Sequence, residues 1–199
     1  MTHLVALARQ TVAGLVVLLA LTVLLGVAYP LAVTGVAALG GDQADRQLLR
    51  VDGEVVGSRQ IGQVFEGEGW FRSRPSAAGD GYDGLASSAS NLGPNNEDLL
   101  ALVEERRAAV AEAEGVDPQA VPPDALTASA SGLDPDISPE YALLQVPRVA
   151  TERDLAEDRV RELVEEHTLG RTLGFLGEPR VNVLELNIAL QAAAGASGG

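Results

Sequence analysis

Apolar residues recur with helical or strand-like periods along most of this chain, but near its start they form an unbroken run. No charged side chain occurs between Arg9 and Asp42, and residues 12–27 read VAGLVVLLALTVLLGV. Eleven residues of that stretch are Leu or Val, which together favour membrane insertion by about 3 to 6 kcal/mol. We therefore predict a transmembrane anchor over residues 12–39, preceded by a short N-terminus of residues 1–11.

A cleaved signal peptide is the alternative interpretation, because the small residues Ala37 and Ala38 suit a signal peptidase. The apolar stretch is longer than the roughly 7 to 15 residues usual in a signal peptide, which favours an uncleaved anchor. Pro30 is predicted to kink or end the helix near the far membrane surface, with Tyr29 at that interface. Arg9 marks the basic flank, so we expect a single-pass protein of the cell membrane with a cytoplasmic N-terminus.

The residues after the anchor, 40–190, are predicted to form one extracytoplasmic domain. Asp52-Gly53 separates two short runs of Leu and Val, which predicts a type I′ hairpin at the start of residues 48–65. Residues 76–96 are rich in Ser, Gly, Asn and Asp, which predicts a loop of about twenty residues. A loop of this length is usually either functional or disordered, and its alanines, Tyr82 and Leu85 favour a functional one.

Helical signals follow this loop. Asn95 or Asn96 is predicted to cap a helix that ends at Gly115. Ser138-Pro139 is predicted to begin a shorter helix that Pro147 ends.

Two further elements complete the expected fold. Thr151 with Asp154 is predicted to open a helix that Gly170 closes. One face of this helix carries Leu155, Val160, Leu163, Val164 and His167. Residues 181–191 fit a strand or a helix, and their composition favours a helix before a flexible tail over residues 191–199. The fold class expected is α+β: one transmembrane helix, then a domain of short strands and several helices.

Composition removes several kinds of chemistry. The chain contains no lysine and no cysteine, so a Walker A loop, a Schiff base, a disulfide and a thiolate metal site are all excluded. From Asp42 onward 13 arginines face 28 acidic residues, and such a surface repels nucleic acid and anionic lipid. We therefore expect no nucleic-acid partner.

The remaining motifs with possible chemistry are weak. Gly79, Gly81 and Gly84 spell G-x-G-x-x-G without the strand and helix that a dinucleotide site needs. His167 has no nearby second histidine, and the pair Asp134 and Asp136 lacks the spacing of a calcium loop, so packing and turn roles are favoured. The serines Ser129 and Ser131 lack a convincing base. No catalytic or metal-binding constellation is predicted.

Four arginines stand out in this acidic domain, namely Arg72, Arg74, Arg148 and Arg153. Their guanidinium groups either bind the carboxylates of a partner or form salt bridges within the domain. From the residues alone, the chain is an anchored, acidic, non-enzymatic protein. A membrane-anchored module that binds its own ligand is the alternative, whereas an anchored hydrolase would need a nucleophile with its base.

Six blocks in fixed order now indicate a family. They are IGQVF (61–65), WFRSRPSAAG (70–79), ASSASNLGPNN (86–96), VPPDALTASASGLDPDIS (121–138), QVPRVATERDL (145–155) and GFLGEPRVNVLELNIAL (174–190). With these blocks the chain resembles the KdpC family, the C subunits of the Kdp potassium-transporting P-type ATPases, over nearly its whole length. It departs from the family at Ser88 and Ala89, where a glycine pair is usual.

The resemblance implies a non-catalytic accessory subunit of an ATP-driven, high-affinity potassium uptake complex. The implied partners are a channel-like KdpA subunit, a catalytic KdpB subunit and a small KdpF subunit, besides membrane lipid. This chain is expected to hold no cofactor itself, since ATP and K⁺ are handled by the complex. A chain without lysine cannot contain the D-K-T-G-T motif that a P-type ATPase phosphorylates, so ATP chemistry belongs to a partner.

Two roles are open for a subunit of this family. It could act as a catalytic chaperone that raises the ATP affinity of KdpB, or it could stabilise the complex over the potassium entrance. The negative charge favours the second role, because it concentrates potassium and repels ATP. Nucleotide or partner contacts are assigned to Gln63 and Arg74. The expected partner-interface residues are Arg72, Arg74, Pro75, Ser76, Ser90, Asn91, Gln145 and Arg148.

Overall fold

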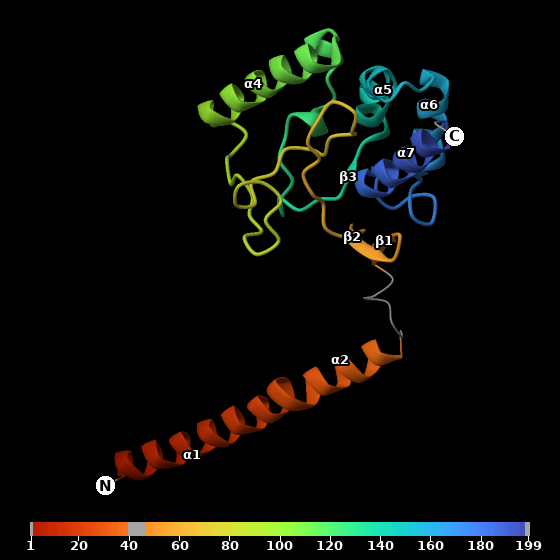
Figure 1. Ribbon diagram of the computed structural model, residues 1–199. Coiled ribbons are helices and arrows are strands. Elements are labelled where there is room, and N and C mark those ends of the chain that lie inside the picture. Colours follow the sequence, from red (N-terminus) through yellow and green to blue (C-terminus); the bar gives the residue numbers. More distant parts are fainter. Residues whose placement is uncertain (1, 40–46, 198–199) are drawn as a thin grey trace. The chain divides into compact units, whose positions relative to one another are not determined.

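The computed structural model describes residues 2–39 and 47–197 of the 199-residue chain. The chain divides into two compact units, residues 1–46 and 47–199, and each is described by itself (Figure 1). The fold class predicted from the sequence is confirmed, because a long apolar helix precedes a domain of helices and short strands.

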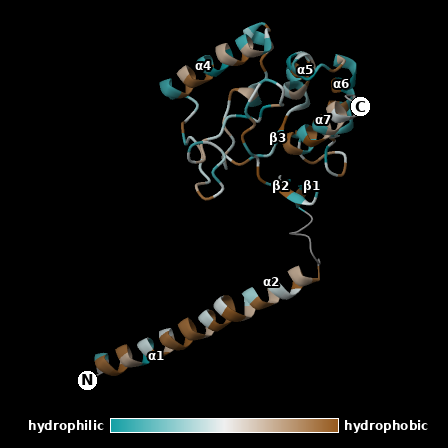
Figure 2. Cartoon of the chain, viewed as in Figure 1, coloured by the Kyte–Doolittle hydropathy of each residue, from teal (hydrophilic) through white to brown (hydrophobic). Residues whose placement is uncertain are grey.

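The first unit is a continuous apolar helix. It consists of α1 (Thr2–Val23), the π-helical segment η1 (Leu24–Ala28) and α2 (Tyr29–Ala38). Its side chains are exposed along the whole length, and the stretch His3–Ala38 is long and apolar enough to cross a membrane (Figure 2).

Pro30 does not end this helix, contrary to one of the two expected outcomes. Tyr29 N–H donates to the Leu24 carbonyl, five residues back, and α2 then continues to Ala38. The wider π turn lies where the proline ring would meet a carbonyl of an ordinary α-helix. The helix therefore accommodates the proline by a local change of register.

The second unit opens with the predicted hairpin. Strands β1 (Leu48–Val51) and β2 (Glu54–Ser58) pair antiparallel. Asp52 and Gly53 both have positive φ, 52° and 87°, as a type I′ turn requires. The hairpin prediction is confirmed.

The core lies between three helices and a small antiparallel sheet (Figure 1). The helices are α5 (Pro139–Arg153), α6 (Glu157–Glu166) and α7 (Val183–Ser197). The sheet has the order β3 (Asp136–Ile137), β5 (Arg180–Asn182), β4 (Thr168–Leu169). The fully or almost fully buried side chains include Phe71, Ala142, Val146, Val149, Val160, Val164, Val181, Leu186 and Leu190.

Helix α4 (Glu97–Glu114) confirms the predicted capping signals. The Asn96 side chain accepts from the N–H groups of Asp98 and Leu99, at 2.7 and 3.3 Å, and Gly115 ends the helix with φ 66°. Of the apolar residues of this helix only Ala111 is buried. Two short 3₁₀ turns, η2 (Pro118–Ala120) and η3 (Pro123–Ala125), lead on to the core.

The predicted break at Pro147 is wrong, because α5 runs through this residue to Arg153. Gln145, Val146, Val149 and Ala150 are almost completely buried on both sides of it. Burial of this face outweighs the roughly 3 kcal/mol that a proline costs inside a helix. In consequence Thr151 lies inside α5.

The boundaries of α6 also differ from those predicted. Asp154 ends α5 in the left-handed conformation, φ 53°, instead of opening the next helix. Helix α6 ends at Glu166, before β4, so Gly170 does not close it. The predicted apolar face is confirmed for Val160, Leu163 and Val164, which are buried. Leu155 lies before the helix, and His167 caps its C-terminal end.

The ambiguous C-terminal segment contains both structures. Residues Arg180–Asn182 form the central strand β5, and α7 follows directly, with the Asn182 side chain accepting from Glu185 N–H at 3.1 Å. The helix continues to Ser197, through most of the segment predicted to be a flexible tail. The loop predicted at 76–96 has no helix or strand.

Candidate functional site

The segment of residues 68–74, a turn followed by irregular chain, packs on the helical core through Phe71 and carries several of the predicted site residues. It is held by side-chain amides in place of a neighbouring strand. Asn187 on α7 accepts from Phe71 N–H and donates to its carbonyl, both at 2.9 Å. Gln145 on α5 does the same for Arg72, at 2.7 and 3.2 Å. We call this arrangement the amide clamp; both amides are buried, which fixes the segment on the core.

A buried ion pair lies beside the amide clamp. Arg148 Nε donates to both carboxylate oxygens of Glu114 at 3.0 Å, and the two side chains are only 8% and 1% exposed. The same guanidinium donates to the carbonyls of Glu68 and Trp70 and to Gln145 Oε1. All of these contacts lie within the domain. The predicted contact of Gln145 and Arg148 with a partner stays a prediction.

Trp70, next to the amide clamp in the sequence, packs against Arg153 and Phe65. The Arg153 guanidinium lies over its ring, 3.8 Å from the centroid, and the Arg153 Nε donates to the Gly69 carbonyl at 2.6 Å. The Phe65 ring is tilted against Trp70 with 6.1 Å between centroids. The two aromatic rings form one wall of a groove.

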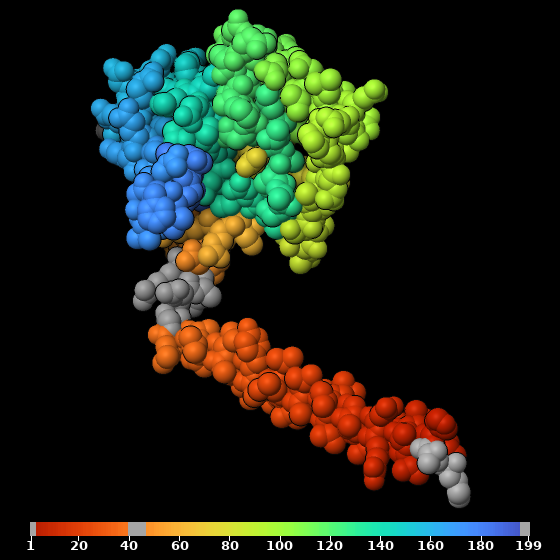
Figure 3. All heavy atoms as spheres, turned by 180° about the vertical axis from the view of Figure 1, so that it is seen from behind, coloured from red at the N-terminus to blue at the C-terminus, as the bar shows by residue number. Residues whose placement is uncertain are grey.

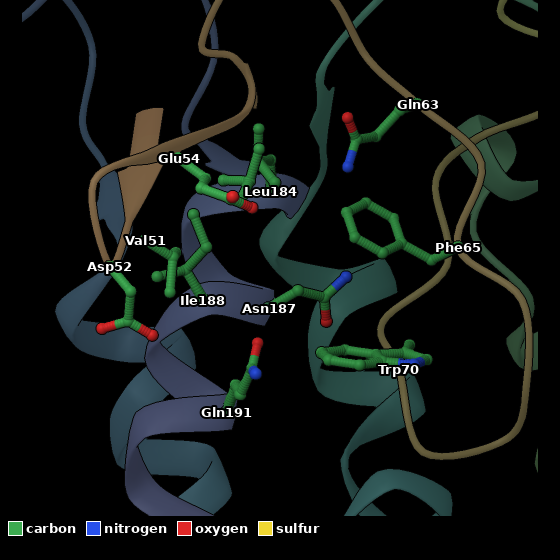
Figure 4. A pocket seen from close by; sticks show the side chains of 11 residues that line it. Val51, Asp52, Glu54, Gln63, Phe65, Trp70, Leu184, Asn187, Ile188 and Gln191 are labelled. Atoms are coloured by element: carbon green, nitrogen blue, oxygen red, sulfur yellow. The ribbon is translucent and has the colours of Figure 1, made fainter. Parts of the chain in front are cut away.

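This groove, of about 470 Å³, lies between the β1–β2 turn, α7 and the segment that carries Phe65 and Trp70 (Figure 4). Its lining is Val51, Asp52, Glu54, Val56, Gln63, Phe65, Trp70, Leu184, Asn187, Ile188 and Gln191. Within the described residues Asp52 and Glu54 form no ion pair. The groove therefore offers aromatic and aliphatic surface together with the carboxylates of Asp52 and Glu54 and the amides of Gln63 and Gln191. Such a lining suits a polar or basic segment.

A second, smaller hollow brings three predicted residues together. Arg72, Arg74 and Ser76 line it with Tyr82, whereas Gln63 lines the groove and contributes no side chain here. Arg74 donates to Asp134 Oδ2 at 2.9 Å and to the Thr127 carbonyl, and its own carbonyl accepts from the Tyr82 hydroxyl at 2.9 Å. Gln63 and Arg74, to which a nucleotide contact was assigned, thus line different hollows. The two hollows share Phe65, and the Gln63 carbonyl accepts from Ser73 Oγ at 3.0 Å.

Two titratable groups on either side of Arg74, Tyr82 and Asp136, have raised pKa values. Burial, with the nearby Asp134 carboxylate, raises the pKa of Tyr82 to about 12. Burial also raises the pKa of Asp136, while its hydrogen bond from Asn182 and the Arg180 guanidinium act in the opposite direction. Asp134 is paired with Arg74, and its Oδ1 accepts from Asp136 N–H, whereas Asp136 begins strand β3 and is bound by Arg180 and Asn182. The predicted turn role is therefore wrong for Asp136.

The loop at 76–96 is fixed at its start and exposed beyond it. Ser76 Oγ donates to the Gly132 carbonyl at 2.6 Å and accepts from the N–H groups of Ala78 and Tyr82. Ser90 and Asn91 are exposed, and Pro75 is half-buried. Ser90 and Asn91 line neither the groove nor the smaller hollow.

The weak motifs have structural roles. Gly79 and Gly81 lie in turns with positive φ, and the next helix after them begins only at Glu97. His167 Nδ1 lies 2.8 Å from the Leu163 carbonyl. In the described part of the chain no group of three or more His, Cys, Asp or Glu side chains could hold a metal ion.

Sequence reasoning missed the amide clamp and the aromatic wall. Asn187 interrupts the apolar run VNVLELNIAL on a face that is otherwise buried, and this could have indicated a structural amide. Nothing in the sequence around Glu114 indicated its burial, because its partner Arg148 lies on another helix, 34 residues further along the chain.

Comparison with known proteins supplies the family. A family profile described as "KdpC: K+-transporting ATPase, c chain" matches residues 11–192. The chain belongs to the KdpC family. This confirms the resemblance carried by the six sequence blocks.

Several relatives named "Potassium-transporting ATPase KdpC subunit" cover almost the same length. The Kineococcus radiotolerans protein is 64% identical over 188 residues, 94% of this chain and 96% of that one. The Mycobacterium tuberculosis protein is 54% identical over 92% of this chain and 97% of its own, and that of Streptomyces avermitilis is 50% identical over 92% and 94%. The KdpC match thus includes the apolar helix and the folded domain.

Proposed function

We propose that this chain is the KdpC subunit of a potassium-transporting ATPase, a single-span accessory protein that assembles with and stabilises the transport subunits. The observation that carries the proposal is the family match over residues 11–192, which spans the anchor and the domain together. The partners proposed are a KdpA-like channel subunit, a KdpB-like ATPase subunit and a KdpF-like small subunit.

The proposed role is non-catalytic. The chain has no lysine and so cannot carry the phosphorylation motif of a P-type ATPase. Its buried arginine, Arg148, is committed to Glu114 and to backbone carbonyls, so its contribution is to hold the domain in shape. ATP hydrolysis and potassium passage are assigned to the partners.

Purification of the tagged chain from potassium-starved membranes in mild detergent tests this proposal. Co-purification of a P-type ATPase subunit and a multi-span channel-like protein is the expected result. Recovery of the chain alone, from membranes in which those subunits are shown to be present, would contradict the assignment.

The domain is proposed to lie outside the cell, with the N-terminus in the cytoplasm. The basic flank at Arg9 and the acidic domain support this orientation. The chain lacks cysteine, so the variant Leu100→Cys, at an exposed site on α4, would give this chain a single residue that reacts with a membrane-impermeant maleimide. Labelling in intact cells is expected, with Leu4→Cys as the control that reacts only after lysis; the reverse pattern would overturn the orientation.

A chaperone role, in which the subunit raises the ATP affinity of KdpB, is the second role that the family suggests. We favour stabilisation, because a domain this acidic repels ATP and because Gln63 and Arg74 lie in different hollows. ATP binding to the full-length chain decides between them. Saturable binding that Gln63→Ala abolishes would establish the chaperone role, whereas its absence supports stabilisation.

A further inference from the structure

The turn between β4 and β5 exposes large apolar side chains. Leu173 is 79% exposed, Phe175 is 68% exposed, and Leu169 and Leu176 are about half exposed. Phe175 is the only exposed aromatic residue among the described residues of the domain, 47–197. We call residues 169–177 the apolar knob; seen from behind, it forms the blue lobe at the lower edge of the domain (Figure 3).

The apolar knob has a fixed shape. Thr172 and Leu176 exchange two backbone hydrogen bonds, each 2.9 Å, and Gly174 N–H donates to the Arg171 carbonyl at 3.0 Å. An ion pair between Arg171 and Glu178 closes its base. A loop held in this way presents its side chains without the entropy loss that a flexible loop suffers on binding.

The backbone of the apolar knob is also strained where its most exposed residue lies. Leu173 has φ 55°, in the left-handed region that side-chain-bearing residues rarely adopt. The Leu173 side chain is outside the hydrophobic core, so no core burial within the described domain offsets this strain. Strained residues with exposed apolar side chains are typical of binding sites.

We propose that the apolar knob docks into an apolar pocket on a neighbouring subunit of the transport complex, with Leu173 and Phe175 as its anchors. This inference rests on the proposed function as a subunit. Residues 169–177 themselves carry Arg171 and no acidic residue, so the pocket that takes the knob would be apolar. The surface around that pocket would be neutral or basic, because the rest of the domain has about twice as many acidic residues as arginines.

Charge argues against the two other occupants, a lipid surface and a second copy of this chain. An anionic leaflet repels the domain, because its 28 acidic residues outweigh the single arginine of the knob, Arg171. A second copy would bring two strongly acidic domains together. A protein pocket of complementary charge meets neither difficulty.

Photo-cross-linking identifies the occupant directly. Phe175→Cys in the full-length chain, labelled with a benzophenone maleimide, places one reactive group on the knob, since the chain has no other cysteine. Irradiation of membranes that contain the assembled complex is expected to yield an adduct with another protein subunit. Leu100→Cys, on exposed α4, is the matched control and should give less than a tenth of this adduct.

Other products would overturn the proposal. An adduct of twice the mass of this chain would indicate self-association, a lipid adduct would indicate the membrane, and no adduct would indicate a free knob. The variant Leu173→Asp/Phe175→Asp gives a second reading, with at least a tenfold loss of co-purified subunits expected and Leu100→Asp unaffected. If the wild-type chain co-purifies and this variant does so equally, the docking inference fails while the subunit assignment stands; if the wild type recovers no subunits, the assignment itself fails.

Discussion

Replacing Arg148 by methionine tests whether the buried ion pair organises the domain. The change keeps the apolar stem of the side chain and removes the guanidinium. Glu114, whose side chain is 1% exposed, then loses its partner, and the Trp70 carbonyl and Gln145 Oε1 each lose a donor. The perturbation thus concentrates on one carboxylate and on the segment held by the amide clamp.

The expected loss of unfolding free energy is about 3 to 5 kcal/mol, the range for breaking a buried pair by removing one partner. Most of that loss is the desolvation of the remaining carboxylate. Glu114→Gln in the same chain removes that charge, so the double variant should recover about 1 to 3 kcal/mol relative to Arg148→Met alone. With an m-value of about 2 kcal/mol per molar urea, the single variant shifts the midpoint by about 2 M.

The assay is urea unfolding of the full-length chain in detergent, followed by fluorescence. Trp70 is the only tryptophan and lies against Arg153 beside the segment, so its emission reports on this region. Arg159→Met is the matched control, because its ion pair with Glu162 is about half exposed and contributes less than about 1 kcal/mol. A loss below 1 kcal/mol for Arg148→Met, or strict additivity in the double variant, would refute the reasoning.

Three further changes test other parts of the structure by the same unfolding measurement. Asn187→Leu keeps the side-chain shape but leaves the backbone N–H and carbonyl of Phe71 buried without partners, so a loss of about 2 to 4 kcal/mol is expected; a loss below 1 kcal/mol would contradict the amide clamp. Burial raises the pKa of Tyr141 to about 12, so the unfolded state releases this proton near pH 10 and the folded state only near pH 12. The wild type therefore loses up to about 2.7 kcal/mol of stability from this group as pH rises through that window, and Tyr141→Phe should make the decline shallower, whereas an unchanged slope would show that the group titrates normally. Asp154→Gly should stabilise by up to about 1 kcal/mol, since Asp154 ends α5 at φ 53°, while Gly115→Ala at φ 66° should destabilise by about 1 kcal/mol; equal effects of one sign would contradict the assigned conformations.

Local signals allowed much of the fold to be predicted. The long apolar helix, the Asp52-Gly53 hairpin and the helix from Asn96 to Gly115 each depend on residues within a few positions of one another. Their chemistry is local: turn φ values, caps and an unbroken apolar run. Local sequence signals predict such elements correctly because no distant contact overrides them.

Predictions failed where distant contacts decide. Pro147 signals a helix end, yet burial of Val146 and Val149 against the core keeps α5 intact. Residues 181–191 were ambiguous because they change from strand to helix at Asn182, where the sheet ends. The amide clamp joins Asn187 to Phe71 across 116 residues, a separation at which no sequence period carries information.

The domain departs from the usual distribution of polar and apolar side chains in two opposite ways, and the two have different consequences. Inside, Arg148, Glu114 and Asn187 are buried, but hydrogen bonds within the chain satisfy them. Outside, Leu173 and Phe175 expose apolar surface, and burying both would be worth about 3 to 6 kcal/mol that the described domain does not gain. Variants of the first group should therefore lower the stability of the chain itself, and variants of the second should leave stability unchanged while reducing recovery of partner subunits. A knob variant that unfolds the domain would show that the exposed side chains serve folding, and would remove the reason for assigning them to a partner.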